Sequence, residues 1–382
     1  PDRSAGFSPI RAMSPVSYAS GARFLELIGA PMLSFYDWYA DLPNASPQMF
    51  GDQTDVPESG DWWDAGYLFM WGSNVPMTRT PDAHWMTEAR YRGQKVVAVA
   101  PDYAENVKFA DEWVSPAPGT DGALAMGMGH VVLKEYFADS MPTFFADYNK
   151  RFTDLPYLIS LVPAEDGSYR PGKYLVAGDI DHPDGGAENQ MWKPAVVDSA
   201  TGEVRIPGGA IGHRYGEEGL GHWNLELGDI DPALTLYSPG GDLDSVEVRL
   251  PRFDGIDGKV AYESRGVPVR RLGDRVVTTV LDLLFAQYGV HRAGLPGTWP
   301  QSYDDPEVPA TPAWQEQHTG VPAAQVIRLA REWAQNAIDT EGRGMILLGA
   351  GTNHWFHSDQ IYRAILLLTT ITGTQGRNGG GW

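Results

Sequence analysis

Residues 67–76 read Tyr-Leu-Phe-Met-Trp-Gly-Ser-Asn-Val-Pro, an apolar run that ends in a polar turn. The apolar run Tyr67–Trp71 predicts a short strand that is buried on both faces, because such strands lack polar alternation. The run passes directly into a turn of glycine, serine and asparagine. Glycine permits close approach of another backbone or a ligand, and serine and asparagine offer hydrogen bonds. We therefore expect a ligand-facing turn at the carboxyl end of a parallel strand.

The residues that follow complete a βαβ unit. Segment 80–92 predicts a helix with Thr80 as its N-cap and a proline at its first position. Residues 95–100 read Lys-Val-Val-Ala-Val-Ala and predict a second buried strand. A further helix is expected over about 121–137. Strand, helix and strand with short connections predict a parallel sheet.

The middle of the chain differs in character. From about 163 to 273, Gly, Pro and Asp interrupt short apolar runs that lack helical periodicity, so we predict a β-rich insertion. Helical periodicity returns at 276–288 and again at 322–336. The fold class predicted is therefore α/β, with parallel-sheet, nucleotide-binding-like domains and a β-rich insertion.

A second strand–turn–helix element lies further along the chain. Residues 345–348 read Met-Ile-Leu-Leu and predict a buried strand, and a helix is expected from about 358 to 370. Between them, the turn 349–354 reads Gly-Ala-Gly-Thr-Asn-His and can bring backbone N–H groups to a phosphate. The dinucleotide fingerprint needs glycine or alanine where His354 stands. This favours a phosphate-bearing ligand other than NAD, and a tight turn without a ligand remains the alternative.

Composition excludes several classes of function. The net charge of −20 over 382 residues argues against nucleic acid as a partner, because phosphate contacts need clustered Lys and Arg. The absence of cysteine excludes disulfides, thiolate catalysis and Cys-ligated iron–sulfur clusters within the segment. The longest apolar run falls short of the roughly 20 residues that span a bilayer. We expect an internal fragment of a longer protein, since the chain begins at Pro1 without Met and stops at Trp382.

Several carboxylates and histidines are candidates for chemistry. Asp55 lies in an acidic, turn-rich loop; it is either a solvated carboxylate or a hard oxygen donor for an oxophilic metal. Asp102 follows the second strand, where an acid typically accepts from ribose hydroxyls or a purine edge. Asp121 opens the next helix, as part of its N-terminal cap or as an acceptor for guanine N1 and its amino group. His354 and His357 lack a nearby third metal ligand, so hydrogen bonding to a heterocyclic ligand suits them better.

Together these segments resemble the alpha subunits of membrane-bound respiratory nitrate reductases, a branch of the dimethyl sulfoxide reductase family of molybdenum enzymes. The likeness runs through nearly the whole chain and is densest at 34–43, 53–59, 71–84 and 349–357. That family binds two molybdopterin guanine dinucleotides. The resemblance would thus account for two nucleotide-binding-like halves and for the departure from the NAD fingerprint.

The resemblance also implies roles for individual residues. In the nitrate reductase branch, the protein ligand to molybdenum is an aspartate in a Gln-Thr-Asp-Val-Pro-Glu-Ser context, and Asp55 stands in that position. The implied cofactor is molybdenum with bis-molybdopterin guanine dinucleotide. The positions that match contacts with one dinucleotide are Trp71, Gly72, Ser73, Asn74, Asp102, Gly119, Thr120 and Asp121. Those that match the segment approaching the other are Gly349, Gly351, Asn353 and His354.

The activity implied is reduction of nitrate to nitrite by oxygen-atom transfer at reduced molybdenum, in anaerobic respiration. Electrons would arrive through a 4Fe-4S cluster of the parent protein and an iron–sulfur beta subunit, ultimately from quinol. A membrane-bound haem gamma subunit is the further partner expected. Membrane association would come through these partners, on the cytoplasmic face unless the parent carries a twin-arginine signal. The segment alone is expected to be inactive.

The family's layout also implies domain boundaries. Residues 46–335 would form one α/β domain that carries the insertion, while 1–45 and 336–382 would belong to a neighbouring α/β domain. An N-terminal iron–sulfur domain and a C-terminal barrel would lie outside the segment.

Other functions share the same features. A nitrite oxidoreductase, a chlorate, perchlorate or selenate reductase, or a hydrocarbon dehydrogenase would also carry Asp55 and the cofactor turns. The local match around Asp55 favours nitrate reductase. An alternative of a different class is a non-catalytic scaffold that binds a nucleotide, and the molybdenum content of the parent protein would distinguish it.

Overall fold

The computed structural model describes residues 3–6, 15–33, 44–51, 57–186, 190–209, 225–241, 243–252, 254 and 261–382. Within these ranges, no helix is both long enough and apolar enough to span a bilayer. The metal ligand expected from the sequence, Asp55, belongs to segment 52–56 and lies outside the described residues.

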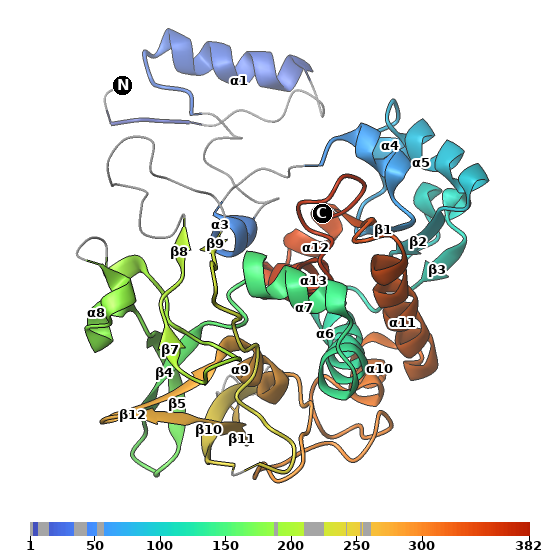
Figure 1. Cartoon of the computed structure of the whole chain (residues 1–382). Helices are drawn as coiled ribbons and strands as arrows, with labels where there is room; N and C mark the ends of the chain where they lie inside the picture. The colour runs from blue at the N-terminus through green and yellow to red at the C-terminus, as the bar shows by residue number, and fades with distance from the viewer. Residues whose placement is uncertain are drawn as a thin grey trace.

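A four-stranded parallel sheet, in the order β14-β1-β2-β3, carries the predicted ligand-facing turns (Figure 1). Every residue of β1 is buried, as expected of a strand that is covered on both faces. In register, Tyr67 of β1 lies between Lys95 of β2 and Gly344 of β14. The predicted strands at 67–71, 95–100 and 345–348 are confirmed. The strands are β1 (Tyr67–Trp71), β2 (Lys95–Val99), β3 (Glu112–Val114) and β14 (Gly344–Leu348).

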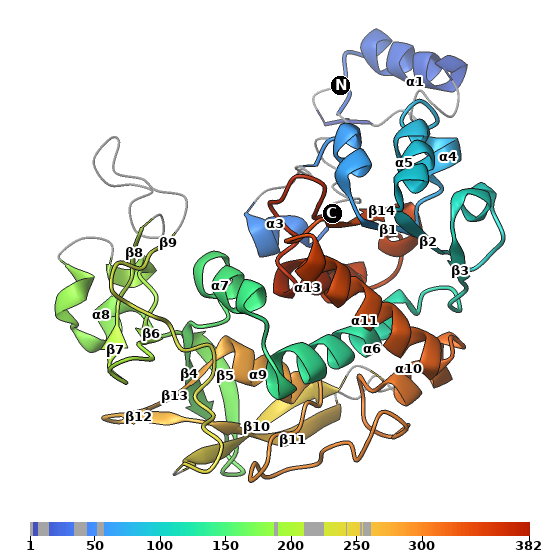
Figure 2. The ribbon, with the colours of Figure 1, turned by 45° about the vertical axis from the view of Figure 1, so that its right-hand side comes forward.

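Helices cover both faces of this sheet (Figure 2). Tyr67, Phe69 and Trp71 pack into the largest apolar cluster, together with residues of α6, α11 and α13. Leu68 and Met70 point the other way and pack against residues of η1, α4 and α5. This period-two alternation is what a strand between two helical layers requires. The elements are η1 (Ser59–Asp64), α4 (Val75–Thr78), α5 (Ala83–Ala89), α6 (Asp121–Leu133), α11 (Ala323–Asp339) and α13 (Ser358–Ile371).

A second, six-stranded sheet in the order β11-β10-β5-β4-β13-β12 includes strands of the predicted β-rich insertion and extends beyond its expected bounds, because β4 and β13 flank residues 163–273. All its neighbours are antiparallel except β10 and β5. Two small hairpins, β6-β7 and β8-β9, accompany it. The strands of the sheet are β4 (Leu158–Pro163), β5 (Tyr169–Tyr174), β10 (Ser245–Arg252), β11 (Ala261–Pro268), β12 (Arg270–Leu272) and β13 (Arg275–Thr279). Those of the hairpins are β6 (Val196–Val197), β7 (Val204–Arg205), β8 (Gly208–Gly209) and β9 (Leu225–Glu226).

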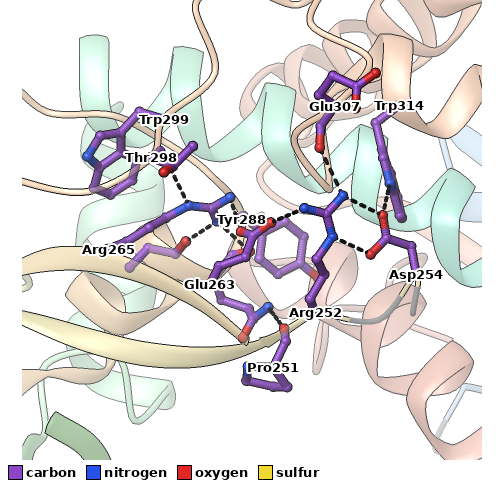
Figure 3. A network of polar contacts seen from close by, with 12 residues as sticks. Pro251, Arg252, Asp254, Glu263, Arg265, Tyr288, Thr298, Trp299, Glu307 and Trp314 are labelled. Carbon is purple, nitrogen blue, oxygen red and sulfur yellow. Dashed lines mark hydrogen bonds and ion pairs between the residues drawn. The ribbon is translucent and has the colours of Figure 1, made fainter. Parts of the chain in front are cut away.

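An ion-pair network joins this second sheet to the helices (Figure 3). Arg265, whose side chain is only 1% exposed, pairs with Glu263. The other oxygen of Glu263 lies 3.4 Å from Nη1 of Arg252. The Nε of Arg252 in turn pairs with Oδ1 of Asp254 at 2.6 Å. The indole of Trp314, on a helix packed against α6, donates to Asp254 at 3.0 Å. The network therefore ties strands β10 and β11 to the helical layer of the parallel sheet.

Two local predictions are corrected by the structure. The helix predicted over 276–288 begins as strand β13 and becomes helical only at α9 (Val280–Gln287), where Thr279 accepts from the Asp282 N–H. The β-branched residues before that point pair with β4. Thr80 is not an N-cap either, because its hydroxyl donates to the carbonyl of Pro76 at 2.8 Å.

The remaining elements are short or lie near the ends of the described ranges. Helix α3 packs through Met49 and Phe50, together with Ala45 before it, against Tyr362 and Leu366 of α13. Strand β14 shares its sheet with β1, and the predicted division at residue 335 stays a prediction for the complete protein. The α-helices still to be given are α1 (Pro15–Leu27), α3 (Ser46–Phe50), α7 (Thr143–Phe152), α8 (Ala177–Ile180), α10 (Pro312–Thr319) and α12 (Ala350–Asn353). The 3-10 helices are η2 (Arg90–Arg92), η3 (Glu105–Phe109), η5 (Pro183–Gly185) and η6 (Gln190–Trp192), and η4 (Lys134–Asp139) is a π-helix.

Candidate functional site

The predicted ligand-facing turns meet at one edge of the parallel sheet, because parallel strands end on the same side. The turn after β1 and the turn after β14 are bonded to each other. The Gly349 N–H donates to the carbonyl of Trp71, and the Gly351 N–H to that of Gly72, each at 3.1 Å. A third bond, from the Gly72 N–H to the carbonyl of Val99, holds the first turn to β2 at 3.0 Å. Two glycine turns far apart in sequence thus form one unit.

Glycine is required at this junction by close backbone packing. Gly72 has φ of +60°, and a Cβ there would lie 2.8 Å from Cγ2 of Thr352. A Cβ on Gly349 would lie 2.5 Å from the carbonyl oxygen of Gly72. A Cβ on Gly351 would lie 2.9 Å from the same oxygen. Contact between the turns therefore explains the glycine pattern even before any ligand is considered.

The side chain of Trp71 lies in the core beneath the turn, and its predicted role in cofactor binding stays a prediction. Its side chain has 0% exposure, and the indole packs beside Phe69 with ring centroids 5.8 Å apart. The indole Nε1–H donates to Oδ1 of Asp121 at 2.8 Å. Asp121 is itself 7% exposed and is the first residue of α6. Burial raises the pKa of the Asp121 carboxyl, and the bond from the indole opposes that rise.

Ser73 and Asn74 are bonded to residues of η3, a segment that was not among the predicted site residues. Asn74 donates through Nδ2 to Glu105 at 2.9 Å and accepts from the Asn106 N–H at 3.1 Å. The bond from Asn74 holds the pKa of the Glu105 carboxyl below its usual range. Asn106 is 1% exposed, and its amide donates to the carbonyl of Ser73 at 3.4 Å. In the sequence, the only sign of these contacts is the polar pair Ser73 and Asn74 shortly after the end of β1.

The remaining turn residues lie at the same edge. The side chain of Asp102 is exposed. Gly119 has φ of +81°, and a Cβ there would lie 3.1 Å from the ring of Trp355. The indole of Trp355, 44% exposed, donates to the carbonyl of Gly351 at 2.9 Å. Thr120 precedes α6 but donates its hydroxyl back to Ala117 at 2.7 Å instead of capping the helix.

Trp355 therefore bridges the turn before α6 and the turn after β14, and sequence reasoning did not single it out. Its neighbours differ in exposure: Asn353 is 5% exposed, whereas His354 lies at the surface. His357 has φ of +58° and directly precedes α13. No group of three or more His, Cys, Asp or Glu side chains suited to a metal ion occurs in the described part of the chain. Asp55, outside that part, is not placed by the structure.

The side chains at this edge suit a nucleotide-bearing ligand. Asp102 and Asp121 offer carboxylate oxygens, the acceptors that ribose hydroxyls and guanine N–H groups need. The half-exposed ring of Trp355 offers an aromatic surface beside Gly119. The start of α6 adds the positive end of a helix dipole. The residues present therefore fit a guanine dinucleotide.

Comparison with known proteins gives close relatives along the whole chain. The nitrate reductase alpha subunit of Mycobacterium tuberculosis is 61% identical over 385 residues, which covers 100% of this chain and 31% of that protein. Respiratory nitrate reductase 1 alpha chain of Escherichia coli is 50% identical over 399 residues, again with 100% of this chain and 32% of that protein. The chain thus spans about a third of the length of these relatives.

A more distant relative acts on another anion. The perchlorate reductase subunit alpha of Dechloromonas aromatica is 33% identical over 395 residues, covering 100% of this chain and 35% of that protein. The family model described as molybdopterin oxidoreductase matches residues 1–382. The match covers the sheet, the insertion and all the turns described above, and the chain therefore belongs to the molybdopterin oxidoreductase family.

Proposed function

We propose that this chain is the central, cofactor-binding part of a nitrate reductase alpha subunit, which reduces nitrate to nitrite in anaerobic respiration. The observation that carries the proposal is the 61% identity to a nitrate reductase alpha subunit, maintained over 100% of the chain. Identity to the perchlorate reductase subunit is 33% over a similar length. Among the anions considered, this difference favours nitrate.

Membership of the family implies a molybdopterin cofactor with molybdenum. We further propose the bis-guanine dinucleotide form, with Asp55 as the protein ligand to the metal. One dinucleotide would be held at the edge formed by Gly72, Asp102 and Asp121, where carboxylates face its guanosine part. The turn from Gly349 to His354 would approach the other. A 4Fe-4S cluster would lie in the rest of the protein, because this chain has no cysteine.

The overall reaction takes up two electrons and two protons: nitrate becomes nitrite, and the oxygen removed leaves as water. When bound, molybdenum supplies the redox and Lewis-acid chemistry of this step. The chain's own contribution is binding and orientation. Carboxylates hold the nucleotide end of the cofactor, and the packed glycine turns keep the sheet edge rigid, so that the reactive end occupies a fixed position.

We propose an iron–sulfur beta subunit and a membrane-bound haem gamma subunit as partners of the complete protein. Association with the membrane would follow from them, on the cytoplasmic face unless the parent carries a twin-arginine signal. The names of the relatives support the alpha-subunit assignment, since "alpha" implies further subunits.

The experiment that tests the proposal is a substrate panel on the complete purified protein. Reduced viologen is offered with nitrate, chlorate, perchlorate or selenate, and kcat/KM is compared between the anions. We expect the highest value for nitrate, with nitrite as the product. A higher kcat/KM for perchlorate would assign the protein to the other branch. A protein without molybdenum and without turnover would favour a nucleotide-binding scaffold.

A further inference from the structure

Trp71 is the most deeply buried of the predicted cofactor-binding side chains that the structure describes. Its exposure is 0%, and it lies in the apolar cluster between β1 and helices α6, α11 and α13. A side chain in that position cannot touch a ligand at the sheet edge. Its indole N–H donates to Oδ1 of Asp121 at 2.8 Å, and Asp121 is the acceptor proposed for guanine.

The carboxylate of Asp121 has a single side-chain donor. Among the described residues, only the indole of Trp71 is bonded to it by a side chain. An ionised carboxylate offers about four lone-pair positions, so about two remain after this bond and the one from the residue's own backbone N–H. Guanine presents two parallel donors, N1–H and the amino group, which require both oxygens of a carboxylate in one plane. Rotation about the Cβ–Cγ bond of Asp121 would take the oxygens out of that plane.

We propose that Trp71 is a positioning residue for guanine recognition: its buried indole N–H fixes the plane of the Asp121 carboxylate toward the base. This inference rests on the proposed binding of a guanine dinucleotide at this edge. The indole is well suited to the task because its ring is locked between Phe69 and the core, so the donor position cannot drift. It also supplies a hydrogen bond that favours the ionised carboxylate in a buried place, where desolvation would otherwise favour the neutral form.

Burial and the indole act on Asp121 in opposite directions. Burial raises the pKa of its carboxyl, while the indole bond and the residue's own backbone N–H lower it, and no charged side chain of the described residues contributes. A protonated carboxyl would place a donor against the donors of guanine. The indole bond therefore extends to lower pH the range in which Asp121 can accept from the base.

The test follows cofactor release from the complete holoenzyme, measured as GMP after acid hydrolysis of the filtrate. In Trp71→Phe the ring remains and the donor is lost, and release should be about tenfold faster, as expected for loss of a hydrogen bond to a charged group. Replacement of Trp71 by benzothienylalanine, in which sulfur takes the place of N–H, keeps the packing and should have the same effect. This second variant serves if the Phe variant folds poorly.

Trp333→Phe is the matched control. Trp333 is also 0% exposed in the same cluster, and its indole donates to Thr372 at 3.1 Å, with no bond to Asp121. This variant should leave the release rate unchanged. The pH midpoint of release should rise in the Trp71 variants and stay in place for Trp333→Phe. A core defect alone would not move that midpoint.

Asp121→Asn separates the two levels of the proposal. If it accelerates release and the Trp71→Phe, Asp121→Asn double variant is no faster than Asp121→Asn, the positioning role is supported. If Asp121→Asn accelerates release but Trp71→Phe has no effect or multiplies with it, the positioning role is wrong and guanine binding at Asp121 stands. If Asp121→Asn changes nothing, the proposed nucleotide site itself is wrong, and the inference falls with it.

Discussion

Replacing Gly72 by Ala should separate the two turns on which the candidate site is built. At φ of +60° an alanine is strained whatever its surroundings, and here its Cβ would also lie 2.8 Å from Cγ2 and 3.0 Å from the backbone N of Thr352. The side-chain methyl can move, but the backbone N belongs to the packed turn after β14. The perturbation therefore acts on the contact between the two turns and on the Gly351–Gly72 hydrogen bond.

The expected magnitude has two parts. The left-handed conformation costs an alanine about 1–2 kcal/mol, and overpacking in a tight site costs about 1–3 kcal/mol more. Gly93→Ala provides the matched control, because Gly93 has φ of +95° with nothing within 4 Å of a Cβ. Only the first part applies there. The difference between the variants thus isolates the close approach, at roughly 5- to 150-fold in an opening equilibrium constant.

Hydrogen exchange of the complete protein measures this difference locally. Peptides covering residues 349–353 report the amides of Gly349 and Gly351, which donate to the carbonyls of the first turn. Gly72→Ala should accelerate their exchange, Gly93→Ala should leave it unchanged, and adding Thr352→Ser to Gly72→Ala should restore part of the protection by removing the methyl. Equal exchange of these peptides in both glycine variants would refute the packing explanation of the glycine pattern.

Four further predictions concern the metal, the buried ionisable groups and the ion-pair network. Asp55→Ala should nearly abolish nitrate reduction, and normal turnover with an unchanged molybdenum EPR signal would exclude it as the ligand. Burial raises the pKa of Asp121, so Asp121→Asn should stabilise the cofactor-free protein at pH 7. The gain should be lost as the pH falls through that raised pKa. A difference in free energy of unfolding between variant and wild type that does not change with pH would contradict this. Burial lowers the pKa of His130 to about 4, so the free energy of unfolding of the wild type should fall by up to roughly 3 kcal/mol as the pH drops from about 6.5 to 4. Urea unfolding of His130→Gln should show a smaller fall over the same pH range. Arg265→Met should lower the free energy of unfolding by about 3–5 kcal/mol, because it leaves Glu263 buried without its main partner. Adding Glu263→Gln to this variant should recover part of the loss. Strictly additive effects of the two substitutions would argue against their coupling.

The parallel sheet was predictable because its signals are local. Tyr67–Trp71 and Met345–Leu348 are short apolar runs that end in glycine turns, which is typical of strands covered on both faces. The helix predicted at 276–288 was wrong over its first part, since β-branched residues there pair with β4, more than a hundred residues earlier. Pairing partners at that distance decide between strand and helix, and a local window cannot contain them.

The candidate site was predictable only in outline. Turns after parallel strands must lie at one edge, so the grouping of Gly72, Asp102 and Gly349 followed from the fold class. The contacts within the site did not. Trp71 and Asp121 are 50 positions apart, and the ring of Trp355 lies beside Gly119 from the far end of the chain. Such contacts depend on how the helices pack on the sheet, which the sequence pattern does not specify.

The proposed cofactor can be checked by measuring the molybdenum and GMP content of the complete purified protein. Metal analysis and acid hydrolysis of one sample give both quantities per polypeptide. We expect one molybdenum and two GMP, because one guanine dinucleotide would lie at the edge that carries Asp121 and the other would approach the turn after β14. Molybdenum without GMP would contradict the assignment of that edge to a guanine nucleotide. Absence of both from a folded, intact protein would contradict the proposed function as a whole.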